Sequence, residues 1–213
     1  KYGNKIYVDS NINNIQKTHE GFKIILENEN IIEAEIIIAG IGSMPSISLF
    51  NNTDLKLDNG ILTDEYCQTS IENVFAAGDV TNFYHPFFNT RLRLESYQHA
   101  QNHGINAGKN IAGIKTEYIS IPWMWSDQFN LNLQLTGLCD EYDEVIIRGN
   151  TLENGIIHFF IKNNKILGAC GLGLISKVGR DIRIASKLIE KNIIVDKKIL
   201  LDQNTKLNKL MKN

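Results

Sequence analysis

The residues best suited to bind a ligand lie between positions 69 and 80. The segment reads Thr-Ser-Ile-Glu-Asn-Val-Phe-Ala-Ala-Gly-Asp-Val, an apolar run that ends in Gly78 and one carboxylate, Asp79. This pattern predicts a strand over Val74–Asp79, and ligands of open α/β sheets bind at the carboxyl ends of strands. A carboxylate there can accept hydrogen bonds from sugar-type hydroxyls, while glycine lets a phosphate chain approach the backbone. A simple Gly-Asp turn is the competing interpretation.

A second polar segment precedes a stretch that is predicted to be helical. Arg93-Leu94-Glu95-Ser96 leads into residues that favour a helix from about Ser96 to Ile111, which Gly113 would end. Ser96 suits the N-cap position, where its hydroxyl accepts a backbone N–H group of the first turn. The N-terminus of such a helix stabilises negative charge on a bound group.

No residue stands out as a general acid or base, and no metal site is predicted. Among the histidines, His99 and His103 lie one helical turn apart, and we interpret this spacing as a coincidence on the helix surface. The cysteines are widely separated and are predicted to be reduced, mostly packed thiols without a chemical role. They are Cys67, Cys139 and Cys170.

The N-terminal half contains short β-rich runs joined by polar segments. Glu35–Ala39 is almost wholly apolar, which suits a strand covered on both faces of a sheet, and the turn Gly40–Pro45 would end it. The strands predicted here are Lys5–Val8, Phe22–Glu27, Glu35–Ala39 and Gly60–Asp64.

Beyond a boundary near Lys115–Pro122 the pattern changes to consecutive short strands, which indicates an antiparallel meander. Asn163-Asn164 is a candidate tight hairpin. A helix is predicted over Lys177–Lys191, with Val178, Ile182, Ala185, Leu188 and Ile189 along one apolar face. The predicted strands are Asn132–Thr136, Glu144–Arg148, Ile156–Lys162 and Lys165–Ala169.

The formal net charge of -2 argues against binding to nucleic acid or to an anionic membrane surface. No apolar run reaches the length of about eighteen residues that a membrane span needs. From Ser176 onward, however, the sequence has ten basic residues and only four acidic ones. This local excess is either a solvated helix face or a surface that docks an acidic electron carrier.

These segments together resemble a known family. Thr69–Val80 resembles the second FAD-binding motif of flavoprotein reductases with two dinucleotide domains, and Ala39–Pro45 resembles the point where their chain re-enters the FAD domain. Ile121-Pro122-Trp123-Met124-Trp125-Ser126-Asp127-Gln128 is similar to the ferredoxin reductase branch, which includes rubredoxin reductases. By this resemblance the chain is identified as a member of the FAD-dependent NAD(P)H:ferredoxin/rubredoxin reductase family, within the pyridine nucleotide-disulfide oxidoreductase superfamily.

The resemblance implies a flavin site. Asp79 would bind the ribityl chain of FAD, next to Gly78. The helix that Ser96 caps would direct its N-terminus at the flavin's pyrimidine carbonyl, with Tyr97 beside the ring. Trp125 would lie against the isoalloxazine, where a flat aromatic side chain can stack and exclude water.

The resemblance also implies a second cofactor, NAD(P)H. Glu95 would lie where the nicotinamide approaches, unless it instead forms a salt bridge with Arg91 or Arg93. Trp123 is assigned mainly to interior packing.

The implied fold class is α/β followed by α+β, that is, partial Rossmann-like FAD/NAD(P)-binding domains and then an antiparallel-sheet interface domain. Residues 1–40 would be the C-terminal tail of the NAD(P)-binding domain, 41–116 the second half of the FAD-binding domain, and 117–213 the interface or dimerisation domain. Neither Gly-x-Gly-x-x-Gly loop of the family occurs in the sequence. We therefore expect the C-terminal fragment of a reductase, with little affinity for FAD by itself.

The implied function is electron transfer from NAD(P)H through FAD to a ferredoxin-type or rubredoxin-type carrier. An alternative of a different class stays open: a non-catalytic module for dimerisation or partner docking, as in a relative of apoptosis-inducing factor. A homodimer is considered in either case, and the cytoplasm is the expected compartment.

Overall fold

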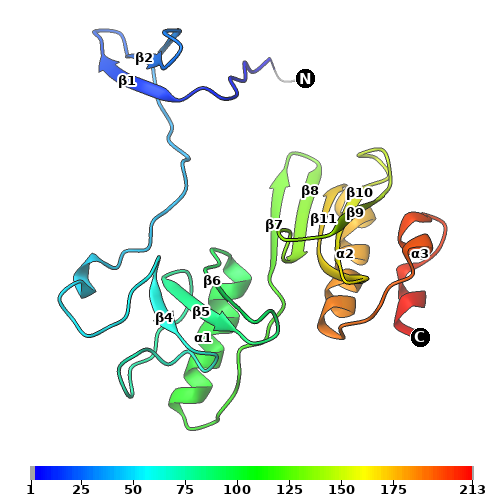
Figure 1. Ribbon diagram of the computed structural model, residues 1–213. Coiled ribbons are helices and arrows are strands. Elements are labelled where there is room, and N and C mark those ends of the chain that lie inside the picture. Colours follow the sequence, from blue (N-terminus) through cyan, green and yellow to red (C-terminus); the bar gives the residue numbers. More distant parts are fainter. Residues whose placement is uncertain (1–2, 213) are drawn as a thin grey trace. The chain divides into compact units, whose positions relative to one another are not determined.

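The computed structural model describes residues 3–212 (Figure 1). Its internal contacts divide the chain into two compact units, Lys1–Ser43 and Met44–Asn213. The first is a small antiparallel sheet. The second contains a small sheet with one helix and then a larger antiparallel sheet with its own helices. This mixed α/β part followed by an antiparallel sheet confirms the predicted fold class.

The first unit is a three-stranded antiparallel sheet in the order β1-β2-β3. Its strands are β1 (Ile12–Lys17), β2 (Phe22–Leu26) and β3 (Ile31–Ala34). Gly21 lies where two backbones meet, because a Cβ there would be 2.4 Å from the carbonyl oxygen of Ala34. Among residues 3–43, Leu26 is the one buried side chain, so this sheet has almost no core.

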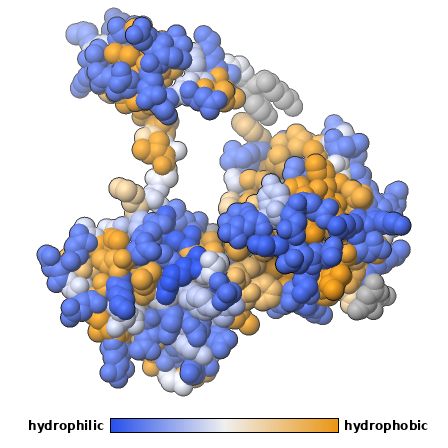
Figure 2. Space-filling view, viewed as in Figure 1, coloured by the Kyte–Doolittle hydropathy of each residue, from blue (hydrophilic) through white to orange (hydrophobic). Residues whose placement is uncertain are grey.

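Two of the strands predicted in this region are wrong. β2 confirms the strand expected over Phe22–Glu27, but Lys5–Val8 and Glu35–Ala39 form no strand. Ile36 and Ile38 are 77% and 92% exposed, and Figure 2 shows apolar surface along this extended connector. A strand with both faces apolar forms only between neighbouring strands, and no segment within residues 3–212 pairs with this one.

The second unit begins with the 3-10 turn η1 (Ser48–Phe50) and a three-stranded sheet in the order β4-β5-β6, in which β4 and β5 are parallel. Helix α1 follows. The strand predicted over Gly60–Asp64 and the helix predicted from Ser96 to Ile111 are both confirmed. The elements are β4 (Ile61–Thr63), β5 (Thr81–His85), β6 (Thr90–Leu92) and α1 (Tyr97–Ile111).

The strand predicted over Val74–Asp79 is wrong. Only Phe75 pairs there, through an isolated bridge to Gln68, and the regular strand β5 starts at Thr81. The physical reason is Gly78, whose φ of +83° takes the chain out of the extended region. A turn then closes, with Thr81 N–H donating to the Gly78 carbonyl at 3.0 Å.

The C-terminal sheet has five antiparallel strands in the order β7-β8-β11-β10-β9. The meander prediction is therefore wrong in part, because β11 lies between β8 and β10 and separates β8 from β9. The Asn163-Asn164 hairpin is confirmed, with φ of 52° and 60° at its two residues. The strands are β7 (Trp123–Gln128), β8 (Leu131–Gly137), β9 (Glu144–Arg148), β10 (Ile156–Lys162) and β11 (Lys165–Gly173).

Helix α2 (Ile175–Glu190) packs against this sheet and buries the five apolar side chains that its sequence pattern predicted. They are between 0% and 2% exposed and meet Phe159 and Ala169 of the sheet. Gly171 permits the close approach, because a Cβ there would lie 3.0 Å from Ile182. Gly171 and Gly173, which follow the strand predicted to end at Ala169, therefore continue β11 beneath the helix.

The chain ends in the short helix α3 (Lys197–Leu201) and the 3-10 helix η2 (Leu207–Lys212), neither of which was predicted. Arg148 of β9 anchors this segment. Its side chain is 7% exposed, and its Nε donates to Asp181 of α2 at 3.1 Å. The other guanidinium nitrogens donate, at 2.6–3.2 Å, to the carbonyl oxygens of Ile199, Leu200, Asp202, Gln203 and Thr205.

We expect Arg148→Met to lower the free energy of unfolding by about 2–3 kcal/mol, because the partly buried Asp181 carboxylate and several partly buried carbonyl oxygens lose the guanidinium that donates to them. Urea unfolding followed by circular dichroism measures the change. Arg180→Met, on the exposed side of α2, is the control and should change stability little. Equal stability of the two variants would contradict the anchoring role of Arg148.

Candidate functional site

The Gly78-Asp79 turn lies immediately before strand β5, and not at the end of a strand as the sequence suggested. Gly78 is buried, whereas the carboxylate of Asp79 is exposed. The Gly78 carbonyl accepts from the Thr81 hydroxyl at 2.8 Å, and the Gly78 N–H donates to Nδ1 of His103 at 3.2 Å. The turn is therefore held from the strand and from α1, with its acidic side chain facing solvent.

The N-terminus of α1 lies beside this turn. Ser96 is its N-cap, as predicted: its hydroxyl oxygen accepts from the His99 N–H at 3.3 Å. The same hydroxyl is 3.4 Å from the Trp123 carbonyl, to which it donates, so the cap also connects the helix to β7. A Cβ on Gly78 would lie 3.8 Å from that of Ala100, one turn into the helix.

Exposed aromatic side chains lie at the start of α1 and along β7. Tyr97 and Trp125 are 69% and 41% exposed, and their rings meet edge to face at 6.5 Å. Trp123 stacks on Trp125 at 5.1 Å, with 23° between the ring planes. Aromatic rings of this exposure offer flat apolar surface to a planar ligand.

A pocket of about 460 Å³ lies between the start of α1 and strands β7 and β8. Glu95 and Ser96 line it together with Trp123. The Glu95 carboxylate pairs with the guanidinium of Arg93, which is one of the two salt bridges that the sequence allowed. The other candidate, Arg91, instead donates to the carbonyl oxygens of Thr63 and Asn82.

The interpretation of His99 and His103 as a surface coincidence is wrong. They are 4% and 0% exposed and pack, with His85, around the ring of Phe83 on β5. Tyr118 completes the cluster, and its hydroxyl is 3.0 Å from Nδ1 of His99.

Burial lowers the pKa of these imidazoles, to about 4 for His99 and to about 3 for His103. The pKa of His85 is lowered for the same reason. Sequence reasoning missed this cluster, although one signal was present: His99, His103, Asn106 and Ala107 recur at helical spacing and form the buried face of α1.

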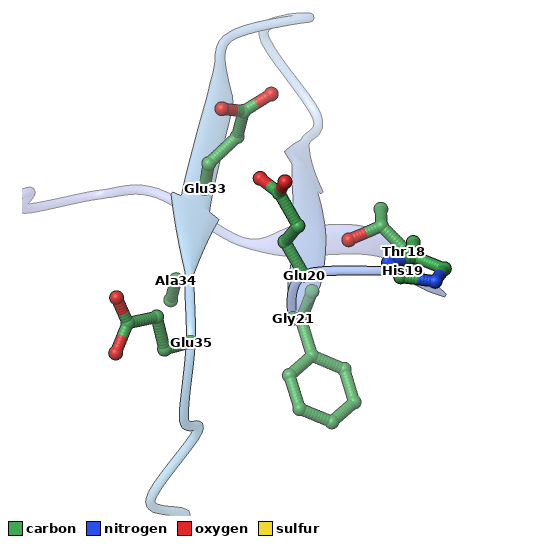
Figure 3. Close-up of a pocket in the computed structure, with 8 residues that line it drawn as sticks. Thr18, His19, Glu20, Gly21, Glu33, Ala34 and Glu35 are labelled. Carbon is green, nitrogen blue, oxygen red and sulfur yellow. The ribbon is translucent and has the colours of Figure 1, made fainter.

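A further pocket, of about 620 Å³, lies in the first unit at the turn between β1 and β2. In Figure 3 the side chains of Glu20 and Glu33, which line the pocket, extend in the same direction, whereas that of Glu35 extends away from them. None of the residues predicted for the flavin site lines this pocket. The residues predicted for the flavin site all belong to the other compact unit.

Two family models match the chain. The model described as pyridine nucleotide-disulphide oxidoreductase matches residues 1–104, and the model described as reductase C-terminal matches residues 123–211. The chain belongs to the pyridine nucleotide-disulphide oxidoreductases. The second match corresponds to the five-stranded sheet with α2 and the C-terminal segment.

Relatives within this family include electron-transfer reductases. The chain is 33% identical, over 183 residues, to the ferredoxin–NAD(+) reductase component of the anthranilate 1,2-dioxygenase system of Burkholderia cepacia, covering 85% of this chain and 44% of that one. It is 37% identical over 131 residues to rhodocoxin reductase of Rhodococcus erythropolis, covering 62% of this chain and 30% of that one.

Among solved structures, a ferredoxin reductase from Rhodopseudomonas palustris superposes with a TM-score of 0.85 at 25% identity, covering 94% of this chain and 49% of that one. The chain thus spans less than half the length of each of these oxidoreductases. Across residues 3–212, no helix is both long enough and apolar enough to cross a bilayer.

We expect Gly78→Ala to lower the free energy of unfolding by about 1–2 kcal/mol, since the φ of +83° is strained for any residue with a Cβ. Steric conflict is not the cause, because a Cβ would make only ordinary contacts, at 3.8 Å or more. Gly104→Ala on α1, where a Cβ meets open space, should instead stabilise by about 0.5–1 kcal/mol. Urea unfolding of both variants provides the comparison, and a neutral Gly78→Ala would refute the strain argument.

Proposed function

We propose that this chain is the C-terminal portion of a flavoprotein reductase that passes electrons from NAD(P)H through FAD to a ferredoxin-type or rubredoxin-type carrier. The names of two relatives, putidaredoxin reductase and rhodocoxin reductase, support this direction of electron flow. The observation that carries the proposal is the grouping of an exposed carboxylate, the Ser96-capped N-terminus of α1 and exposed aromatic rings. The family resemblance implied the same residues for one site.

The described residues fit one part of an FAD molecule. Asp79 would accept hydrogen bonds from the ribityl hydroxyls, since its carboxylate is exposed beside a turn without a side chain at Gly78. The N-terminus of α1 would stabilise negative charge at the pyrimidine end of the ring. Tyr97 and Trp125 would cover the flavin and exclude water.

FAD supplies hydride acceptance from a nicotinamide and one-electron transfer to the carrier, while the protein binds and orients the reactants. Glu95 belongs, in this proposal, to the nicotinamide side of the site. Its ion pair with Arg93 would hold the carboxylate at the mouth of the pocket that it lines with Trp123.

The proposed domains are 1–40 for the tail of the NAD(P)-binding domain, 41–116 for the second half of the FAD-binding domain and 117–213 for the interface domain. The boundary between the two compact units, at Ser43, supports the first division. The start of β7 at Trp123 and the reductase C-terminal match from residue 123 support the second.

The proposed partner is an acidic carrier protein. Arg180, Arg183 and Lys187 are exposed along one side of α2 and line a groove of about 810 Å³ whose wall includes Trp123. Cations in such a position attract an acidic partner and orient it toward the aromatic residues. The proposal also includes a homodimer and the cytoplasm, the latter because all three cysteines are free.

The alternative of a non-catalytic docking module has no support in the names of the relatives. The test that separates the two is simple. The full-length protein should be yellow and should be bleached by NADH or NADPH, whereas the 213-residue chain by itself should bind little FAD. A full-length protein that is colourless and takes up no added FAD would exclude the reductase.

Asp79→Ala in the full-length protein should weaken FAD binding about tenfold or more, because a charge-assisted hydrogen bond contributes about 1.5–3 kcal/mol. Flavin fluorescence during titration gives the dissociation constant. Glu72→Ala removes an exposed carboxylate from the same segment and should leave FAD affinity unchanged. If both variants bind FAD as the parent does, Asp79 has no role in the flavin site.

A further inference from the structure

The buried imidazole of His103 makes a hydrogen bond that depends on its charge state. The Gly78 N–H points at Nδ1 over 3.2 Å, so this nitrogen must be an acceptor. The Thr81 hydroxyl, 3.4 Å from the same nitrogen, gives its proton to the Gly78 carbonyl instead. A neutral imidazole has one acceptor nitrogen. The proton of His103 therefore lies on Nε2, which has no hydrogen-bond partner among residues 3–212.

Resting on the proposed function, we propose that His103 is a positioning residue for the flavin site: its neutral imidazole holds the Gly78 peptide and thereby sets Asp79 against the ribityl chain. His103 does not reach the ligand itself, because it is fully buried behind the turn. It acts through one backbone N–H, on the glycine that precedes the binding carboxylate. Loss of that bond would free the turn from α1.

The groups around His103 disfavour protonation of its imidazole. From α1 itself His99 lies 4.8 Å away, and from the loop before β7 Tyr118 lies 4.5 Å away, both measured between ring centres. Cys67, whose thiol is 3.8 Å from the His103 carbonyl, faces it from a third element. His85 of β5 lies across the ring of Phe83.

None of these groups is a carboxylate that could stabilise an imidazolium. Asp64, which acts on Cys67, uses its side chain to accept backbone N–H groups of Tyr66 and Gln68. Burial and the neighbouring His99 hold the pKa of His103 at about 3, below the ordinary 6.5. In the native protein the imidazole is therefore neutral at every pH where the enzyme would work.

Acid would reverse this arrangement. Protonation places a hydrogen on Nδ1, so that two donors, the imidazolium and the Gly78 N–H, would face each other. The pKa of His103 is lower in the folded than in the unfolded state. Its contribution to the free energy of unfolding is therefore complete above pH 6.5 and is lost as the pH falls toward 3. Flavin should therefore be released in acid as the folded protein loses stability, and the part of this loss that comes from His103 should disappear when position 103 cannot titrate.

The experiment uses the flavin-loaded full-length protein and three variants. His103→Phe keeps a ring of similar size but offers no acceptor, so the buried Gly78 N–H loses its partner. His103→Asn places an amide oxygen close to the position of Nδ1 and does not titrate. His85→Phe disturbs the same cluster at a ring whose hydrogen bond goes to the Ser120 carbonyl and not to Gly78. Flavin release, followed by fluorescence, is measured against pH, and circular dichroism follows unfolding in parallel.

At pH 7 we expect His103→Phe to weaken FAD binding about tenfold, the consequence of one unpaired buried donor. His103→Asn should remain within about threefold of the parent and should retain FAD to a pH about half a unit lower or more. His85→Phe should bind FAD like the parent at pH 7. The inference is overturned if His103→Asn releases flavin along the same pH profile as the parent, or if the two Phe variants lose FAD equally.

A measurement without flavin separates this inference from the proposed function. The nitrogen chemical shifts of His103, recorded by NMR on histidine-labelled full-length protein, report which ring nitrogen carries the proton. A proton on Nδ1 would overturn the positioning role even in a protein that binds FAD. A protein that takes up no FAD would exclude the reductase, and the tautomer would still decide whether His103 holds Gly78.

Discussion

The peptide group of Gly78 is hydrogen-bonded on both sides: its N–H donates to His103 and its carbonyl accepts from the Thr81 hydroxyl. Thr81 begins β5 and His103 lies in the middle of α1, so one peptide joins the sheet to the helix. The Ser96 cap that starts the same helix also contacts β7. The packing of α1 therefore sets the position of Asp79 and that of the aromatic strand together.

The C-terminal sheet provides the rigid support for the other half of the candidate site. Helix α2 lies close over the sheet because β11 has glycine at the contact. The buried guanidinium of Arg148 on β9 binds both Asp181 of α2 and the carbonyl oxygens of the C-terminal segment. β7 is at the edge of this sheet, next to β8 only. An edge strand leaves one side uncovered, which explains why Trp125 keeps 41% of its surface exposed although its strand is well paired.

The connector before Met44 also shows that the neighbours of a segment decide how exposed its side chains are. Its isoleucines are as apolar as those of a buried strand, yet they are exposed and unpaired within residues 3–212. In the proposed reductase, other segments of the flavin-binding and nicotinamide-binding domains would pair with this connector. Those domains would also provide the glycine loops that this sequence lacks. In that proposal the described residues would supply the ribityl, pyrimidine and aromatic contacts, and other residues would supply the diphosphate contacts.

Sequence alone determined the features that depend on neighbours within a few residues. The Ser96 cap, the Asn163-Asn164 hairpin and the apolar face of α2 arise from local hydrogen bonding and helical spacing, and the Gly78-Asp79 motif is likewise continuous in sequence. Tertiary structure decided the features that need distant partners: the insertion of β11 beside β8, the turn where a strand was expected before Asp79, and the burial of His103. Strand pairing and desolvation are set by which segments meet in space, and spacing along one chain does not contain that information.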